Sequence, residues 1–189
     1  MLKDLLKASR SYRRFYEDDE IPKELLENWV DNVRYAPSAA NAQTLKFKIC
    51  TGEEEREGIF PWIRWAAALE DWRGPEPGER PSAYVVIVND KSLGKGRGAD
   101  EGICAQTIML SAAEAGYGGC IIGSFEREPV AEYLGIDQTR YSVDYILALG
   151  RPKETVILTD VGEDGKTAYY RDRDGIHFVP KRALRDILL

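Results

Sequence analysis

The sequence predicts an α/β or α+β fold built around one central sheet. Two continuous apolar runs, Ser82–Asn89 and Ser142–Leu149, have the composition of strands that are buried on both faces. Two other segments, Lys23–Tyr35 and Ala99–Ala115, repeat their apolar residues at helical spacing. Strands that alternate with helices along a chain are typical of helices packed on one sheet.

Shorter signals predict the remaining elements. Helices are expected over Met1–Ala8, Glu53–Leu69 and Arg127–Leu134, and strands over Leu45–Cys50 and Gly118–Ser124. Three prolines and two glycines make Arg73–Pro81 a loop, and Lys153–Gly165 has no regular pattern. An Asp-Gly pair predicts a hairpin over Tyr169–Phe178, and Val179–Leu189 is expected to begin as a basic helix.

The composition is that of a globular protein. With 189 residues, 43% of them hydrophobic and 31% charged, the chain suits one domain over 1–189. A net charge of −6 argues against nucleic acid as a partner. The apolar runs are too short for a membrane-spanning helix, and no secretory signal is visible, so a cytoplasmic protein without a membrane partner is expected.

Cysteine and histidine usage argues against a metal site. The three cysteines, Cys50, Cys104 and Cys120, form no C-x-x-C pair, and there is only one histidine, His177. These counts do not favour a disulfide framework, a zinc site or an iron–sulfur cluster. Cys104 and Cys120 are expected to be core thiols, and His177 is expected in a strand as a structural residue.

The first candidate binding motif is Arg10-Ser11-x-Arg13. Two guanidinium groups and a hydroxyl within four residues can hold a phosphate, because arginine matches phosphate oxygens with paired hydrogen bonds. The alternative is an exposed basic turn that pairs with the acidic run Glu17–Asp19.

The second motif is the small-residue segment Ala36–Gln43. Its small side chains let a ligand approach the backbone, and Asn41 and Gln43 can read the polar edge of a planar heterocycle. Alternatively, the segment is a connection in which Ser38 and Asn41 form only turn hydrogen bonds.

The third motif is the glycine-rich segment Gly116–Ser124. It fails the G-x-G-x-x-G pattern and follows a helix, so a dinucleotide-binding turn is excluded. Glycine permits close approach of the backbone to a flat ligand, although a glycine-rich entry into a buried strand is the alternative.

The fourth motif is Pro180-Lys181-Arg182. Cations at the start of a helix oppose its dipole, which suggests an anion held between them, whereas exposed cations at a helix start are the alternative. No acid, base or nucleophile arrangement stands out, which favours an enzyme whose cofactor performs the chemistry.

In their order along the chain, these motifs resemble the FMN-dependent nitroreductase family. The resemblance covers nearly the whole chain and rests on the following segments: Arg10–Phe15, Pro37–Gln43, Asp100–Gly116, Gly118–Ser124, Leu147–Pro152 and Val179–Arg182. It implies an α+β fold: a three-layer α-β-α sandwich with a central mixed, mainly antiparallel sheet. It also implies a homodimer with an FMN at each of two sites on the subunit interface.

The resemblance assigns cofactor contacts by motif. The phosphate would be held by Arg10, Ser11, Arg13, Lys181 and Arg182. The flavin would be lined from the other subunit by Pro37, Ser38 and Asn41, with Asn41 at the polar edge of the ring and Gln43 as a further cofactor contact. The backbone of Ile122, Gly123 and Ser124 would lie along the ring, with an N–H near flavin N5 in the Gly123 region.

The implied activity is ping-pong hydride transfer. NAD(P)H would reduce FMN at N5, and an electron-poor acceptor such as a nitroaromatic or quinone would then be reduced on the same flavin face. Three alternatives stay open: a flavin-binding or redox-sensing module without efficient turnover, a specialised flavin enzyme such as a reductive dehalogenase, and a protein that binds another phosphorylated ligand.

Three departures from the family pattern concern the cofactor and the acceptor. Ser9 stands where many members have another arginine, and Thr44-Leu45 replaces a frequent Pro-Trp. The chain is also short, with Trp62–Trp72 and the loop Arg73–Pro81 in the region that normally covers the flavin. The identity of the acceptor is therefore not given by the resemblance.

Overall fold

A computed structural model describes residues 1–69, 71–96 and 98–189. Its centre is a sheet of five strands: β1 (Phe15–Tyr16), β2 (Leu45–Cys50), β3 (Ala83–Asp90), β4 (Gly118–Ile122) and β5 (Tyr141–Pro152). The long strand β5 pairs with β3 on one edge and with β4 and β1 on the other, and β2 lies beyond β3. All of these pairings are antiparallel.

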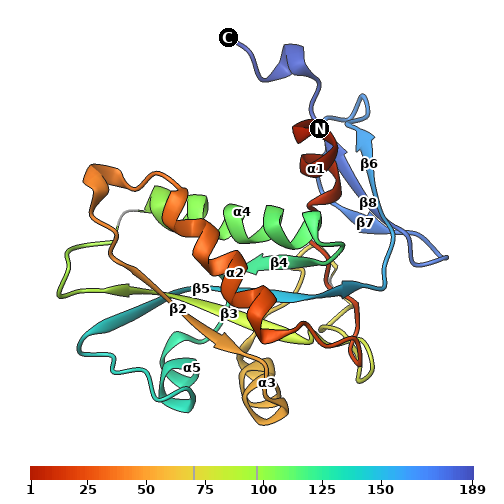
Figure 1. The fold of residues 1–189 in the computed structure, drawn as a ribbon. Helices are drawn as coiled ribbons and strands as arrows, with labels where there is room; N and C mark the ends of the chain where they lie inside the picture. Colours follow the sequence, from red (N-terminus) through yellow and green to blue (C-terminus); the bar gives the residue numbers. More distant parts are fainter. Residues whose placement is uncertain (70, 97) are drawn as a thin grey trace.

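Helices cover both faces of this sheet (Figure 1). On one face lie α2 (Lys23–Asn32) and α4 (Gly98–Glu114), and on the other lie α3 (Glu53–Ile59) and α5 (Arg127–Tyr133). Strand β3 is buried throughout and alternates between two cores: Val85 and Ile87 pack with α2 and α4, whereas Tyr84 and Val86 pack on the opposite side. Burial on both faces explains why β3 is apolar at nearly every position.

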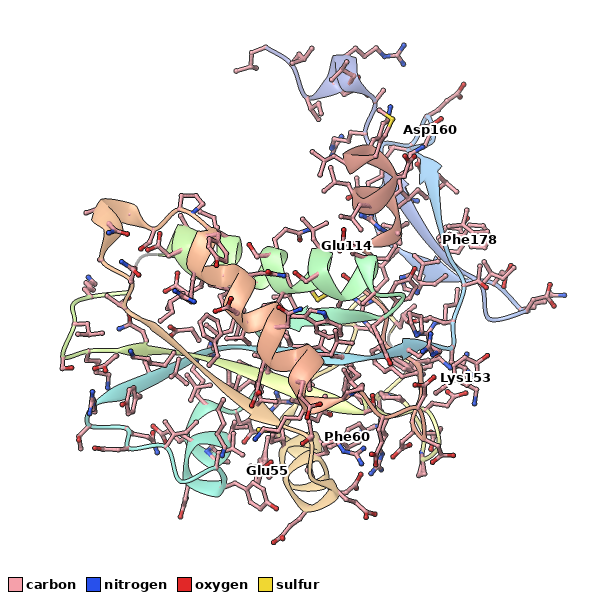
Figure 2. The ribbon with its side chains drawn as sticks, viewed as in Figure 1. Glu55, Phe60, Glu114, Lys153, Asp160 and Phe178 are labelled. Atoms are coloured by element: carbon pink, nitrogen blue, oxygen red, sulfur yellow. The ribbon has the colours of Figure 1, made fainter. Side chains whose placement is uncertain are left out.

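A second, smaller sheet lies at one end of the molecule beside α1 (Leu2–Ala8) (Figure 1). It contains β6 (Val156–Asp160), β7 (Tyr170–Arg171) and β8 (His177–Lys181), in the order β6-β8-β7. Lys153, labelled in Figure 2, follows the point where β5 leaves the central sheet. The chain ends in a projecting segment with a 3₁₀ turn over Leu184–Asp186.

The predicted α+β class is confirmed, but the helix expected over Glu53–Leu69 is too long. The α-helix ends at Ile59, a 3₁₀ turn follows over Phe60–Trp62, and Ile63 then pairs with Phe125 as an isolated β-bridge. The aromatic residues that follow α3 are therefore not part of a helix. They pack in the core on the face of the sheet that α3 and α5 cover.

Two expectations for the C-terminal part are also wrong. Lys153–Gly165 is not irregular, because it contains β6, and Lys181 ends a strand and does not begin a helix. Strand β6 pairs in parallel with β8, about twenty residues further along, so no local pattern reveals it. The hairpin expected over Tyr169–Phe178 is confirmed, with Tyr170 opposite Phe178.

The described residues contain no helix that is both long and apolar enough to cross a membrane. Cys50, Cys104 and Cys120 are free and buried, and burial raises the pKa of Cys104 to about 11. The expectation that Cys104 and Cys120 are core thiols is confirmed. Within the same residues, no group of three or more His, Cys, Asp or Glu could hold a metal ion.

Candidate functional site

The arginine motif and the glycine-rich strand lie side by side. Ser11 forms a parallel β-bridge with Gly119, and the Tyr12 N–H donates to the Gly119 carbonyl at 2.8 Å. The chain then turns away, so that Phe15 pairs with Pro152 at the end of β5. Two segments that are more than 100 residues apart in sequence therefore form one surface.

Close packing explains the two glycines at the start of β4. A Cβ on Gly118 would lie 2.5 Å from the Tyr12 ring, and one on Gly119 would lie 2.3 Å from the Ala148 carbonyl oxygen. These two glycines let the arginine segment and β5 approach β4 closely. They therefore fit the alternative interpretation of this motif, a glycine-rich entry into a buried strand. Gly123 and Ser124, by contrast, are exposed at the end of β4.

A cavity of about 590 Å³ opens beside β4. Its lining comes from the arginine motif, the segment after α3, the loop after Trp72, strand β4 with the two residues after it, and the segment just before β7. The lining residues are Arg13, Ile63, Arg64, Trp65, Ala66, Ala67, Arg73, Cys120, Ile121, Ile122, Gly123, Ser124 and Tyr169. Of the predicted site residues, Arg13, Ile122, Gly123 and Ser124 thus meet at one cavity.

A smaller cavity of about 210 Å³ lies next to the first and shares Ile121 with it. It is lined by Ser9, Arg10, Ser11, Gln106, Met109 and Ile121. The Arg10 guanidinium donates through Nη2 to the Leu6 carbonyl, while its buried Nε has no partner among the described residues. A buried donor without an acceptor is unfavourable, and an anion in this cavity would supply one.

The described residues do not show the pairing of Arg10 or Arg13 with the acidic run Glu17–Asp19. The Glu17 carboxylate accepts the N–H groups of Gly78 and Arg80, and Asp19 pairs with Arg151. The Arg13 guanidinium lies 4.9 Å from the centre of the Tyr169 ring and has no carboxylate partner in the described parts of the chain.

A buried acid holds the backbone of Arg13. Glu154 accepts the Arg13 N–H at one oxygen and Arg171 Nη2 at the other, the latter at 2.8 Å. The Glu154 side chain is fully buried, and that of Arg171 is 13% exposed. Arg171 also stacks over Trp72 at 4.3 Å, so this pair joins the central sheet, the small sheet and the cavity wall.

His177 lies in β8, as expected, and is 1% exposed. Burial lowers the pKa of His177, the neighbouring Glu154 raises it, and Arg13 and Arg171 lower it further. Its ring packs on Tyr169 with centroids 5.2 Å apart. A neutral imidazole that supports Tyr169 from behind is a structural role, consistent with the sequence expectation.

The second motif lies elsewhere in the chain, at the N-terminal end of α4. The Ser38 hydroxyl accepts the Gln43 N–H at 3.1 Å, which is a local hydrogen bond of the kind expected for a turn, and it donates to Asp100 on α4 at 2.7 Å, which is a tertiary contact. Asn41 and Gln43 have φ values of 53° and 49°, and Gln43 Nε2 donates to Asn41 Oδ1. Left-handed backbone at residues other than glycine is unusual and occurs often at functional sites.

This second motif does not line the 590 Å³ cavity. Pro37, Ser38 and Gln43 line a separate cavity of about 420 Å³ between α2, β2 and α4. Asp100, which binds Ser38, and Met109, which lies beside Arg10, are about 14 Å apart along α4 at 1.5 Å per residue. Within one chain, the segment Pro37–Gln43 therefore lies away from the arginine motif.

Lys181 and Arg182 are also not brought to the arginine motif. Lys181 ends β8 opposite Asp160, and both cations are exposed. Neither residue is in the lining of the 590 Å³ cavity or of the 210 Å³ cavity. The argument from cations at a helix start no longer applies, because Lys181 ends strand β8 and Arg182 follows it ahead of the 3₁₀ turn over Leu184–Asp186.

Sequence reasoning missed Arg64, Trp65, Arg73, Tyr169 and Glu154. The first four line the cavity from segments that carry no recognisable motif. Arg64 and Arg73 are cations in an acidic chain, which is only a weak sign that they belong to a binding site. The burial of Glu154 depends on contacts with residues far away in sequence, so no local pattern predicts it.

Comparisons with known proteins identify the family. The family model described as Nitroreductase family matches residues 6–151. A Bacillus subtilis protein, YodC, provisionally named an NAD(P)H nitroreductase, is 25% identical over 178 residues, covering 78% of this chain and 88% of its own. An FMN-dependent nitroreductase from Clostridium difficile R20291 is 26% identical with a TM-score of 0.63, covering 79% of this chain and 87% of its own. A structure from Exiguobacterium sibiricum, solved with FMN, is 20% identical with a TM-score of 0.66, covering 82% and 89%, and is similar in fold.

Proposed function

The chain belongs to the Nitroreductase family, and we propose that it is an FMN-dependent oxidoreductase that uses NAD(P)H to reduce an electron-poor acceptor by a ping-pong mechanism. The observation that carries this proposal is the juxtaposition of the arginine motif with β4 around two adjoining cavities. The similarity to an FMN-dependent nitroreductase at 26% identity supports the choice of cofactor.

The residues present fit a phosphorylated, flat cofactor. The buried Arg10 Nε lacks an acceptor in the described residues, and the Arg13 guanidinium has no carboxylate partner there. The volume of about 590 Å³ is within the range of roughly 300–1,000 Å³ that small-molecule sites occupy. Exposed Gly123 and Ser124 leave the end of β4 open to a planar ring.

In this proposal the phosphate is held by Arg10, Ser11 and Arg13. Bound FMN would supply hydride transfer between the nicotinamide and the acceptor. The protein's own part is to bind and to orient: guanidinium groups bind the phosphate, and the backbone of Ile122, Gly123 and Ser124 lines the ring. Trp65 and Tyr169 exclude water from the cavity wall.

We propose a homodimer in which a second copy completes each site. Pro37, Ser38, Asn41 and Gln43 lie away from the arginine motif within one chain, at the other end of α4. The left-handed backbone at Asn41 and Gln43 suggests a function beyond a simple connection. Light scattering at micromolar concentration tests this, and a monomer that still retains FMN would contradict it.

The acceptor is proposed to be a nitroaromatic, a quinone or a similar electron-poor compound, in the cytoplasm. An absorbance spectrum of the purified protein, followed by reconstitution with FMN and an assay of NAD(P)H oxidation, tests the function. A yellow protein that oxidises NAD(P)H when an acceptor is added is the expected result. A protein that takes up no FMN would overturn the proposal, and tight FMN binding with negligible turnover would favour the redox-sensing alternative.

A further inference from the structure

The 590 Å³ cavity has a cationic lining in an acidic protein. Three of its lining residues are arginines, Arg13, Arg64 and Arg73, and no aspartate or glutamate is among its described lining residues. The chain as a whole carries a net charge of −6. An anion approaching the molecule is repelled by the overall charge, so these guanidinium groups provide a local attraction at the cavity.

Arg64 and Arg13, which we assign to the cofactor phosphate, lie beside different ends of β4. The Arg64 N–H donates to the Ser124 carbonyl at 3.0 Å, just beyond the end of β4. Arg13, by contrast, is close enough to Cys120 to influence the pKa of its thiol. Cys120 and Ser124 are about 13 Å apart along an extended chain at ~3.3 Å per residue.

Packing holds Arg73 at the same cavity. Its neighbour Gly74 has a φ of 140°, and a Cβ there would lie 2.6 Å from Trp65 Cδ1. The loop therefore rests directly on the indole of Trp65, which is 8% exposed and also lines the cavity. The Arg73 side chain has no hydrogen bond or ion pair within the described residues.

The ion pair that Arg64 forms among the described residues leaves its guanidinium available. Arg64 Nη2 lies 2.8 Å from Glu126 Oε1, but the two side chains are 70% and 46% exposed. Exposed pairs of this kind contribute little to stability and exchange readily with water or another anion. Arg64 and Arg73 can thus both turn to a ligand in the cavity.

We propose that Arg64 and Arg73 form an anion subsite that selects an acceptor carrying a carboxylate or phosphate group. This inference rests on the proposed function. Trp65 and Tyr169 offer aromatic walls for a flat ring, and the small side chains of Ala66 and Ala67 leave space beside them. A guanidinium binds a carboxylate or a phosphate with charge-assisted hydrogen bonds.

The test compares two nitroaromatic probes that differ in charge, using FMN-loaded enzyme. The probes are 4-nitrobenzoate and the neutral 4-nitrobenzamide. In each case NAD(P)H and one proton convert the nitro group to a nitroso group and water, with two electrons passing to the probe. We expect wild-type kcat/KM to be at least tenfold higher for 4-nitrobenzoate, and this preference to fall with added salt.

The double variant Arg64→Gln/Arg73→Gln should reduce the ratio of the two kcat/KM values to about one. Lys166→Gln removes one positive charge at a side chain that is 80% exposed and does not line the cavity, and should keep the wild-type ratio. A wild-type ratio near one, or a ratio that the double variant does not change, overturns the subsite.

Phosphates of the nicotinamide nucleotide have the same chemistry, so a second arm measures the KM for NADH and NADPH. If the double variant raises only these KM values, the arginines bind the electron donor and the acceptor subsite is overturned. FMN affinity is measured in parallel, and a tenfold or larger loss in the double variant assigns them to the cofactor with the same consequence. If wild type binds no FMN, the proposed function itself fails, which is a separate result.

Discussion

Replacing Glu154 with glutamine tests whether a buried ion pair holds the arginine motif in place. The carboxylate accepts the Arg13 N–H and one Arg171 Nη2 hydrogen bond, and its side chain is fully buried. Glutamine has nearly the same shape but only one acceptor oxygen and no charge. Arg171 would remain largely buried, opposite a neutral group.

The expected loss follows from this burial. Breaking a buried pair by neutralising one partner reduces the free energy of unfolding by about 3–5 kcal/mol. We expect the lower end, about 3 kcal/mol, because the glutamine oxygen keeps one hydrogen bond and Arg171 still stacks over Trp72. For a chain of this size that loss lowers the Tm by roughly 6–12 °C.

The chain offers a matched control in Glu126→Gln. The Arg64–Glu126 pair has the same 2.8 Å nitrogen–oxygen distance as Arg171–Glu154 but is exposed. Its loss should therefore change the free energy of unfolding by less than about 1 kcal/mol. Urea denaturation followed by circular dichroism measures both variants. Equal losses in the two, or a Glu154→Gln loss below about 1 kcal/mol, would refute the reasoning.

Three further predictions concern packing, pH and the cofactor. Gly119→Ala would place a Cβ 2.3 Å from a backbone oxygen and should lower the free energy of unfolding by about 1–3 kcal/mol or more. Gly102→Ala, which lies in open space on α4, is the control and should be neutral or stabilising in the same urea titration. Burial lowers the pKa of His177 in the folded protein below its ordinary value of 6.5, so the unfolded chain binds more protons. The free energy of unfolding should therefore be highest above pH 6.5 and fall as the pH drops below it, and His177→Phe should remove part of this pH dependence. Arg10→Ala should weaken FMN binding by about 10- to 100-fold in fluorescence titrations, as loss of a charge-assisted hydrogen bond predicts, and unchanged affinity would contradict our assignment.

Periodicity predicted the parts of the fold that are encoded locally. The helices α2 and α4 and the strands β3 and β5 carry their own signals, because each buries one helical face or both strand faces. Strand β6 carries no such signal, since its partner β8 is distant in sequence and its residues are either half-buried or exposed. The helix expected through Leu69 ends early because its aromatic residues lie in and after a 3₁₀ turn, where they join the core that also contains residues of α5 and β4.

For the site, spacing identified the motifs but not how they are arranged. Arg10-Ser11-x-Arg13 and the end of β4 were both predicted, and the structure places them together. The burial of Glu154 could not be predicted, because it depends on Arg13, 141 positions earlier. The same limit applies to Arg64 and Arg73, which reach the cavity from segments that have no motif.

Free arginines in an acidic protein require an explanation, and the neighbouring acids supply it. Four carboxylates near the arginine motif are engaged by other groups: Glu17 by backbone N–H groups, Asp19 by Arg151, Glu79 by Arg14 and Lys153, and Glu154 by Arg171. Arg13 therefore remains without a carboxylate partner in the described residues although the net charge is −6. The local pairing of acids, more than the total charge, therefore decides where an anion can bind.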